Sequence, residues 1–449
     1  MSDILNIGAS GIRAYQNAIG TVSENIANTG VEGYSKRAAV LNEVSASTST
    51  ITRREVTAAS GVTTSGIMRL VDPFKEADVR AAGADLAASD SAIQWLDQIQ
   101  TALTGNRLGD QLTTFFNAAN AVAADPSASA PRTTMLDAAE GAAGAFRATG
   151  NALAQVAANL DASAQDSVTT FNGLAAALAK VNDGLSRNVP NTNGSAQLLD
   201  QRDQLLEKMS AIANISVTTD EVGRATVRVG TGSGPAIVQG NDAGSLSYAR
   251  GNDGAVAYAV HFAGNITTAA VSGGALAGVA DGAQRLAEAQ NQLGQVAGDF
   301  VAGVNGVQAS GIDLDGNPGA PMFAAGSGGA TDVEVALTSP RGIAAAAPGG
   351  GPLDNGNLAN LTALRGSAGF EDKVSQLVTD SAAALAAKKT IADAQATIHD
   401  NAVADRDSVS GVNLDSEAVD LLRFQQAYSA SSRVIQTARD IFQSILNIR

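Results

Sequence analysis

The chain has 449 residues, a length that allows about three domains and a sizeable buried core. Hydrophobic residues make up 45%, charged residues 16% and aromatic residues 4%, so the composition excludes a disordered chain and favours helices packed closely through alanine and aliphatic side chains. The net charge of −15 argues against a nucleic-acid partner, and the absence of cysteine excludes disulfides, thiolate metal sites and cysteine nucleophiles.

The sequence shows no pattern typical of a signal peptide or a membrane span. Its first residues lack a basic stretch followed by an apolar one, so we expect no cleaved secretory signal, and any export would need another route. The longest stretch without Asp, Glu, Lys or Arg, residues 254–280, is interrupted by glycines and by polar residues such as Asn265. We therefore expect no membrane insertion.

The amino-terminal residues predict a coiled-coil helix. Apolar side chains recur there at alternating steps of three and four, and Gly8 interrupts the stripe. Asn28 and Gly30 are residues that suit a helix end, so we expect the helix to stop there. The stripe consists of Leu5, Ile12, Tyr15, Ile19, Val22 and Ile26.

The next segments predict a short strand region followed by helices. Residues 36–72 read as short strands and loops, and residues 73–212 show helical periodicity. Breaks are expected near Pro126, Pro131 and residues 190–194.

Around Ile215 the apolar period changes to two, and Gly-rich turns separate short apolar runs. Residues 216–272 therefore predict a small antiparallel sheet domain. Helical periodicity returns from Leu286 to Val307. Residues 311–357 carry turn signals and one plausible strand at Val333, Val335 and Leu337, after which helices resume through Ile398.

The carboxy-terminal residues repeat the heptad stepping, with Glu417 and Ser431 as polar interruptions. Chain ends are usually poorly ordered, so heptad stripes at both ends suggest that these ends pair with each other or with neighbours. Ordering about 20 residues costs roughly 1 to 2 kcal/mol each, whereas six apolar anchors return on the order of 10 kcal/mol. We expect both ends to be mobile in the free monomer and to order when neighbouring subunits bury them. The carboxy-terminal stripe consists of Leu414, Leu421, Phe424, Tyr428, Ile435, Phe442 and Ile445.

These patterns predict a mainly α fold with an inserted β domain. Residues 1–35 and 411–449 would form terminal coiled-coil helices. Residues 36–215 and 273–410 would form a discontinuous helical bundle built from both chain halves, and residues 216–272 an inserted antiparallel outer domain.

Two loops resemble ligand-binding motifs but read better as turns. Residues 230–234 (Gly-Thr-Gly-Ser-Gly) lack the Lys-Ser or Lys-Thr pair and the helix start of a phosphate loop. Asp313, Asp315 and Asn317 hold the first three positions of a calcium loop, but the required glycine is misplaced and Ala324 stands at the twelfth position.

The sequence offers no recognisable catalytic group. His261 and His399 are the only histidines, and no Gly-x-Ser-x-Gly motif supplies a nucleophile. The carboxylate pairs Glu371 and Asp372, and Asp405 and Asp407, lie in polar, Ala-rich segments typical of solvated helix faces. We expect a non-enzyme without catalytic, cofactor-binding or metal-binding residues.

Four segments carry a resemblance to a known family. Residues 23–36 (Ser-Glu-Asn-Ile-Ala-Asn-Thr-Gly-Val-Glu-Gly-Tyr-Ser-Lys) resemble the amino-terminal signature of the axial proteins of the bacterial flagellum. Residues 61–74, 198–205 and 411–437 narrow the match, and together the four segments are similar to the family of hook-associated protein 1 (FlgK), the first of the hook–filament junction proteins. The signature positions are Asn25, Asn28, Gly33, Tyr34, Asp200, Arg202, Asp203, Asn413, Gln425 and Gln426.

The resemblance implies a structural function in the flagellum. Family members are exported unfolded through the flagellar type III channel, act outside the cell, and form a ring at the distal end of the hook that the filament needs for attachment. Their terminal helices coil together around the central channel, so the two apolar stripes would become subunit contacts. Implied partners are further copies of the chain, the hook protein, the second hook–filament junction protein and a cytoplasmic export chaperone that masks the carboxy-terminal stripe.

Two other functions remain open at this point. The chain could be another flagellar axial protein, either a hook protein or a flagellin, although residues 199–204 and 423–428 favour the junction family. It could also be a secreted glycan-binding protein whose binding site lies in residues 216–272.

Overall fold

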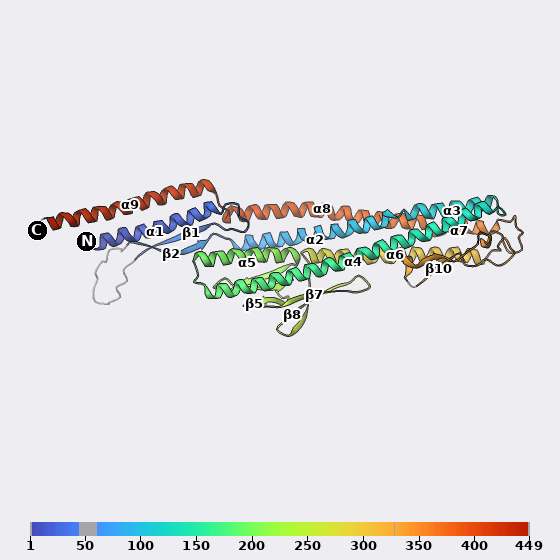
Figure 1. Cartoon of the computed structure of the whole chain (residues 1–449), viewed down its shortest axis with the longest axis horizontal. Helices are drawn as coiled ribbons and strands as arrows, with labels where there is room; N and C mark the ends of the chain where they lie inside the picture. Colours follow the sequence, from blue (N-terminus) through green and yellow to red (C-terminus); the bar gives the residue numbers. More distant parts are fainter. Residues whose placement is uncertain (1, 45–60, 327, 448–449) are drawn as a thin grey trace.

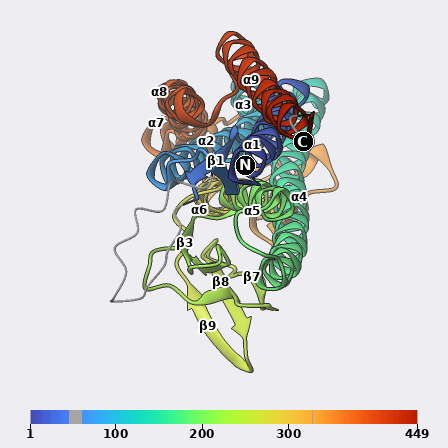
Figure 2. The ribbon, with the colours of Figure 1, turned by 90° about the vertical axis from the view of Figure 1, so that its left-hand side faces the viewer.

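The computed structural model describes residues 2–44, 61–326 and 328–447. The molecule is an elongated rod, and the first and last helices lie side by side at one of its ends (Figure 1). Seen along the rod, strands β8 and β9 project from one side of the helical body (Figure 2). The predicted mainly α fold with an inserted β region is confirmed.

The body consists of long helices from both halves of the chain. α2 packs against α6 and α8, so segments that are far apart in sequence form one bundle. α4 runs along much of the rod and contacts α3, α5 and α6. The body helices are α2 (Pro73–Gly105), α3 (Leu108–Ala124), α4 (Ser129–Arg187), α5 (Asn193–Ile212), α6 (Ala275–Ala309), α7 (Gly356–Ala368) and α8 (Phe370–Ser410).

The expected helix breaks are partly confirmed. Interruptions occur around Pro126 and between α4 and α5, but the break expected at Pro131 is wrong because α4 already begins at Ser129. A proline in the first helical turn removes no internal hydrogen bond, so Pro131 is tolerated there. The short link between α2 and α3, where Arg107 has a left-handed backbone with φ 49°, was not predicted.

The strands form small antiparallel sheets. The inserted region contains a four-stranded sheet of β3 to β6 and a three-stranded sheet of β7 to β9. The β1–β2 hairpin follows α1, and β10 pairs with β11, which matches the strand expected near Val333. The strands are β1 (Arg37–Glu43), β2 (Val62–Arg69), β3 (Ile215–Thr219), β4 (Ala225–Val229), β5 (Ala236–Gln239), β6 (Asp242–Ala243), β7 (Ser245–Arg250), β8 (Val256–Phe262), β9 (Asn265–Ala269), β10 (Phe323–Ala325) and β11 (Val333–Val335).

Two buried hydrophobic clusters hold the body and the sheets. The larger cluster joins α2, α3, α4 and α6 around an aromatic group in which Phe300 contacts Phe115 and Phe370 edge to face. The second cluster lies between α4, α5 and the apolar faces of the two inserted sheets. Alternate residues of β4 are buried, as the period-two pattern predicted.

The suspected ligand loops are turns. Residues 230–234 link β4 to β5. The Asp313 carboxylate accepts hydrogen bonds from the backbone nitrogens of Asp315 and Asn317 at 2.9 and 2.8 Å, and the Asp315 carboxylate pairs with Arg341. Within the described ranges, no helix is long and apolar enough to cross a bilayer.

Candidate assembly site

The terminal helices α1 (Ser2–Ala27) and α9 (Leu414–Asn447) pack along one another; we call them the terminal pair (Figures 1 and 2). Their contact depends on small residues. A Cβ atom added to Gly8 would lie 2.6 Å from Ile435 Cγ1, and one added to Gly11 would lie 2.6 Å from Ser431 Oγ. Gly8 and Ser431, which interrupt the apolar stripes in the sequence, are therefore points of closest approach.

The apolar residues of α1 flank this contact. The most buried line of α1 follows Gly8, Gly11, Ala14, Ala18 and Val22, where the helix also faces the β1–β2 hairpin. Of the six positions in the expected amino-terminal stripe, only Val22 is fully buried, and the remaining five are half-buried: Leu5, Ile12, Tyr15, Ile19 and Ile26.

The apolar residues of α9 extend beyond what α1 covers. Leu421, Phe424 and Ile435 are half-buried, and the rings of Tyr15 and Phe424 lie 6.4 Å apart. We call the exposed apolar residues of this helix the outer surface of α9. Among them, Leu422 is 58% exposed and Phe442 is 53% exposed. The members of this surface are Leu414, Val419, Leu422, Tyr428, Val434, Ile441, Phe442 and Ile445.

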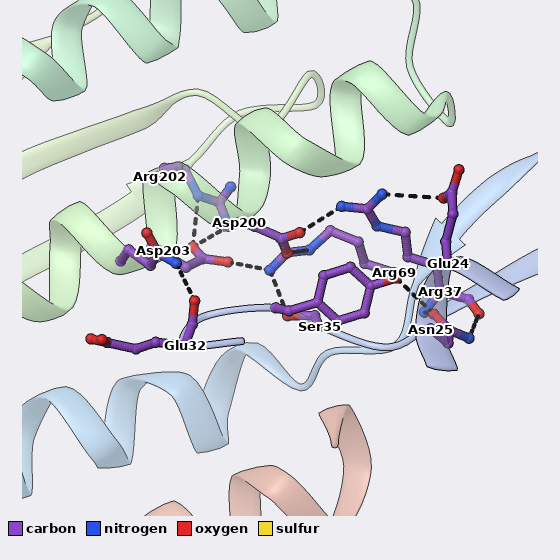
Figure 3. A network of polar contacts seen from close by, with 11 residues as sticks. Glu24, Asn25, Glu32, Ser35, Arg37, Arg69, Asp200, Arg202 and Asp203 are labelled. Atoms are coloured by element: carbon purple, nitrogen blue, oxygen red, sulfur yellow. Dashed lines mark hydrogen bonds and ion pairs between the residues drawn. The ribbon is translucent and has the colours of Figure 1, made fainter. Parts of the chain in front are cut away.

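A network of polar side chains lies where the terminal pair meets the body (Figure 3). We call it the polar joint, and it draws on α1, the hairpin, α5 and α9. Its members are Glu24, Asn25, Tyr34, Ser35, Lys36, Arg37, Arg69, Asp200, Arg202, Asp203 and Glu417.

Asn25 connects four segments of the chain. Its amide nitrogen donates to the backbone oxygen of Arg37 at 2.8 Å and to Glu417 Oε2 at 2.9 Å. Its amide oxygen accepts from the backbone nitrogen of Arg37 at 3.0 Å and from the Tyr34 hydroxyl at 2.9 Å. An Asn side chain offers two donors and two lone pairs, so the buried Asn25 makes every hydrogen bond available to it.

Two arginines of the hairpin hold the carboxylates of α5. Arg37 Nη2 donates to Asp200 Oδ2 at 2.8 Å, and Arg69 Nε pairs with Asp200 Oδ1 at 2.8 Å. Arg69 Nη2 reaches Asp203 Oδ2 at 2.7 Å and the Ser35 hydroxyl at 3.0 Å. Each guanidinium is planar and presents several donors, so this arrangement fixes direction as well as distance.

Arg202 extends the network to the inserted sheets. Its guanidinium donates to Asp203 Oδ1 through Nε and Nη2, at 2.8 and 2.6 Å. The remaining Nη1 donates to the backbone oxygen of Gly223, in the turn between β3 and β4, at 2.7 Å. The network therefore connects the terminal pair, the body and the β3–β4 turn of the inserted sheets.

The turn after α1 requires glycine at residue 33. Gly33 has φ +72°, and a Cβ there would overlap the Gln204 side chain at about 2.1 to 2.5 Å. Gln204 Nε2 donates to the backbone oxygen of Glu32 at 2.6 Å, which holds this turn against α5. Before the turn, Asn28 ends α1 by donating to the backbone oxygen of Glu24.

The start of α9 is held by the same joint. The Asn413 side chain caps the helix by accepting from the backbone nitrogen of Ser416 at 3.1 Å. One turn later, Glu417 pairs with Lys36 Nζ at 2.7 Å, and the backbone nitrogen of Lys36 donates to the Ser410 oxygen. Glu417 is only 1% exposed. This charged residue of the apolar stripe can be buried because it has two partners, Asn25 and Lys36.

The joint carries equal numbers of formal charges of each sign. Burial raises the pKa of Tyr34, with Arg37 opposing this shift, so the hydroxyl stays protonated and donates to Asn25. Beside the joint, burial and then the charge of Asp203 raise the pKa of Glu76. The cations are Lys36, Arg37, Arg69 and Arg202, and the anions are Glu24, Asp200, Asp203 and Glu417.

Most of the signature positions come together here. Asn25, Tyr34, Asp200, Arg202 and Asp203 belong to the polar joint, Gly33 adjoins it, and Asn28 and Asn413 end and begin the terminal helices. Gln425 and Gln426 lie apart from it, exposed on α9. Sequence reasoning did not single out Lys36, Arg37, Arg69 and Glu417 as site residues, although a charge inside an apolar heptad stripe was a usable signal for Glu417.

The chain is an elongated body of helices with paired termini, and comparisons with known proteins indicate the class to which it belongs. Residues 406–448 match the model described as flagellar basal body rod FlgEFG protein C-terminal. A solved structure, that of the flagellar hook junction protein FlgK from Burkholderia pseudomallei, is similar in fold, with TM-score 0.50 and 24% identity, and the match covers 56% of this chain and 47% of that chain. The class is that of flagellar axial proteins.

Residues 93–323, more than half of the chain, match the model of the flagellar hook-associated protein FlgK helical domain. Flagellar hook-associated protein 1 of Salmonella typhimurium is 26% identical over the full length of both chains, and that of Bacillus subtilis is 22% identical over 97% of this chain and 96% of its own. The chain belongs to the flagellar hook-associated protein FlgK family. It is thus a structural protein of the flagellum that assembles with axial components.

Proposed function

We propose that the chain is the ring-forming subunit of the hook–filament junction, and that neighbouring copies pack through their terminal pairs. The uncovered apolar residues of α9 carry this proposal. α1 covers only part of that helix, so an isolated molecule exposes Leu422, Phe442 and Ile445 to water. Burying a large apolar side chain is worth about 1.5 to 3 kcal/mol, so several such residues on one helix favour association.

The proposed ring assigns a role to each part of the chain. Residues 1–35 and 411–449 would form the axial core, residues 36–215 and 273–410 the surrounding body, and residues 216–272 the outer domain. The hook protein would bind below the ring and the second junction protein above it. The alternative of a hook protein or a flagellin loses support, because the matching helical-domain model is that of FlgK.

Export would precede assembly. A chain without cysteine forms no disulfide that would have to open before passage through a narrow channel. A cytoplasmic chaperone that covers the outer surface of α9 would prevent premature association of its exposed apolar side chains. The finished protein would then lie outside the cell, in the flagellum.

A deletion strain tests the proposed position in the flagellum. We expect intact hooks, no filaments and flagellin shed into the medium, as seen by electron microscopy and by blotting of the culture supernatant. A strain without hooks would contradict the proposal.

Complementation with single variants tests the surface. Leu422→Asp should leave hooks bare, because it places a charge where the neighbouring copy would bury an apolar side chain. The matched control is Ile266→Asp, which changes a residue that is 69% exposed on the projecting strand β9 and should restore filaments. Equal filament counts for the two variants would rule out the outer surface of α9 as the contact.

A further inference from the structure

The attachment of the terminal pair to the body differs from the packing inside the body. Among the described residues, neither of the two large hydrophobic clusters contains a member of α1, the β1–β2 hairpin or α9. α1 packs on β1 and β2, and β2 packs on α5. The polar joint lies along this route.

Apolar and polar contacts control orientation differently. Hydrophobic burial has no preferred direction, so an apolar interface tolerates sliding and rotation. Buried ion pairs pay a large desolvation cost and often add little net stability, but a misaligned pair leaves a charge unsatisfied. Asp200 accepts a hydrogen bond from Arg37 and forms an ion pair with Arg69, each at 2.8 Å, so a shift of α5 against the hairpin would separate at least one of these charged pairs.

We propose that the polar joint is a positioning device that holds the terminal pair at one angle to the body. Arg37 and Arg69 are its positioning residues because they transmit the placement of α5 to the hairpin and, through Asn25, to α1 and α9. Within the proposed junction role, this angle would set where each subunit presents the outer surface of α9 to its neighbour.

The competing explanation is that the polar joint stabilises the fold and does not set the angle of the terminal pair. Replacing its charged residues by apolar ones distinguishes these two roles. The triple variant Arg37→Met, Arg69→Met, Asp200→Leu removes three buried charges and leaves Asp203 paired with Arg202. Glu24 loses its ion pair with Arg37, but its side chain is 42% exposed and keeps the hydrogen bond from Asn193. Replacing a buried ion network by apolar residues often preserves or raises stability. If stability is all that the joint supplies, the triple variant should behave like the unmodified protein.

The test measures one distance in the isolated full-length chain. Because the sequence contains no cysteine, Lys180→Cys on α4 and Ser429→Cys on α9, both at exposed positions, give a unique pair of spin labels. Pulsed electron paramagnetic resonance reports the distribution of distances between the labels, and circular dichroism follows thermal unfolding of the same samples. The matched control is Asp161→Asn, which breaks the ion pair to Arg250 between α4 and β7, away from the joint.

Because the polar joint ties the start of α9 to the same chain through Asn25 and Lys36, we expect a single narrow distance in the unmodified background and in Asp161→Asn, in place of the mobile ends predicted from the sequence. In Asp200→Asn we expect a distribution at least twofold broader. The triple variant should unfold at an unchanged or higher temperature and still show the broad distribution. A narrow, unshifted distance in the triple variant would overturn the proposal, and so would failure of both joint variants to fold. Because this readout needs no assembly, it stands apart from the complementation test of the junction role.

Discussion

The body and the terminal pair of this protein are held together by different kinds of interaction. The body encloses two apolar clusters, with Phe300 in contact with several other aromatic rings. The terminal pair is joined through glycine contacts, and its base is a network of buried charges. The body therefore gains its stability from apolar burial within one chain, whereas the terminal pair is held at its base by buried charges and leaves apolar side chains of α9 exposed.

The largest expected effect falls in the body. Phe300→Ala should lower the free energy of unfolding by about 3 to 5 kcal/mol, because it leaves a cavity in the larger cluster. Urea denaturation followed by circular dichroism measures this loss. Phe74→Ala, at a residue that is 81% exposed, is the matched control and should change stability little. A small effect of Phe300→Ala would mean that the body is not the stable region.

The next effect falls in the polar joint. Asn25→Ala removes four hydrogen bonds and leaves the Tyr34 hydroxyl and Glu417 Oε2 without a buried partner. Each unsatisfied buried group costs about 1 to 3 kcal/mol, so we expect hydrogen exchange to accelerate in the first turns of α9 while the body stays protected. Asn42→Ala, on the hairpin, serves as control. Uniform acceleration over the whole chain would erase the distinction between the two regions.

A smaller effect separates two glycines of the same helix. Gly8→Ala would press a Cβ against Ile435 at 2.6 Å and should destabilise the terminal pair by about 1 kcal/mol. The Cβ of Gly20→Ala meets no described residue within 4 Å, and the variant should stabilise α1 by roughly 0.5 to 1 kcal/mol. Amide exchange in α1 measures both. The same sign of change for the two variants would show that α1 and α9 do not touch at Gly8.

The smallest effect depends on pH. Burial raises the pKa of Glu76 in the folded state, so this carboxyl favours folding below its unfolded pKa and loses that contribution as the pH rises through the folded value. Glu76→Gln stays neutral and should therefore raise the unfolding temperature at pH 8 and change it little at pH 3. Glu43→Gln, at an exposed position, is the control. A rise in the unfolding temperature of Glu76→Gln only at acidic pH would contradict a raised pKa of Glu76 in the folded state.

The fold was largely predictable because its signals are local. Heptad spacing gave both terminal helices, and the change from a helical period to a period of two located the inserted strands. The break expected at Pro131 failed because a proline's effect depends on its position in the helix, which only the start of α4 at Ser129 reveals. The inserted strands pair with their neighbours in sequence, but no local pattern marks the break between β6 and β7 that divides them into two sheets.

The site was predicted less completely because it depends on contacts across the chain. The resemblance singled out Asn25, Asp200 and Asp203, yet the sequence alone did not show that they meet through Arg37 and Arg69. Gly8 and Glu417 looked like interruptions of apolar stripes. In the structure Gly8 allows α1 to approach α9, and Glu417 completes the hydrogen bonds of Asn25.

Because α1 and α9 lie side by side at one end of the rod (Figure 1), the residues between them form one long loop whose two ends are close in space. Residues can be inserted or deleted between α1 and α9 with little change in where the two helices meet. The entropic cost of closing a surface loop grows only slowly with its length. The alignment with the Salmonella relative runs over 559 positions, whereas this chain has 449 residues, so such length differences occur in the family. A chain of this architecture can therefore change in length and still bring its two terminal helices together in the same way.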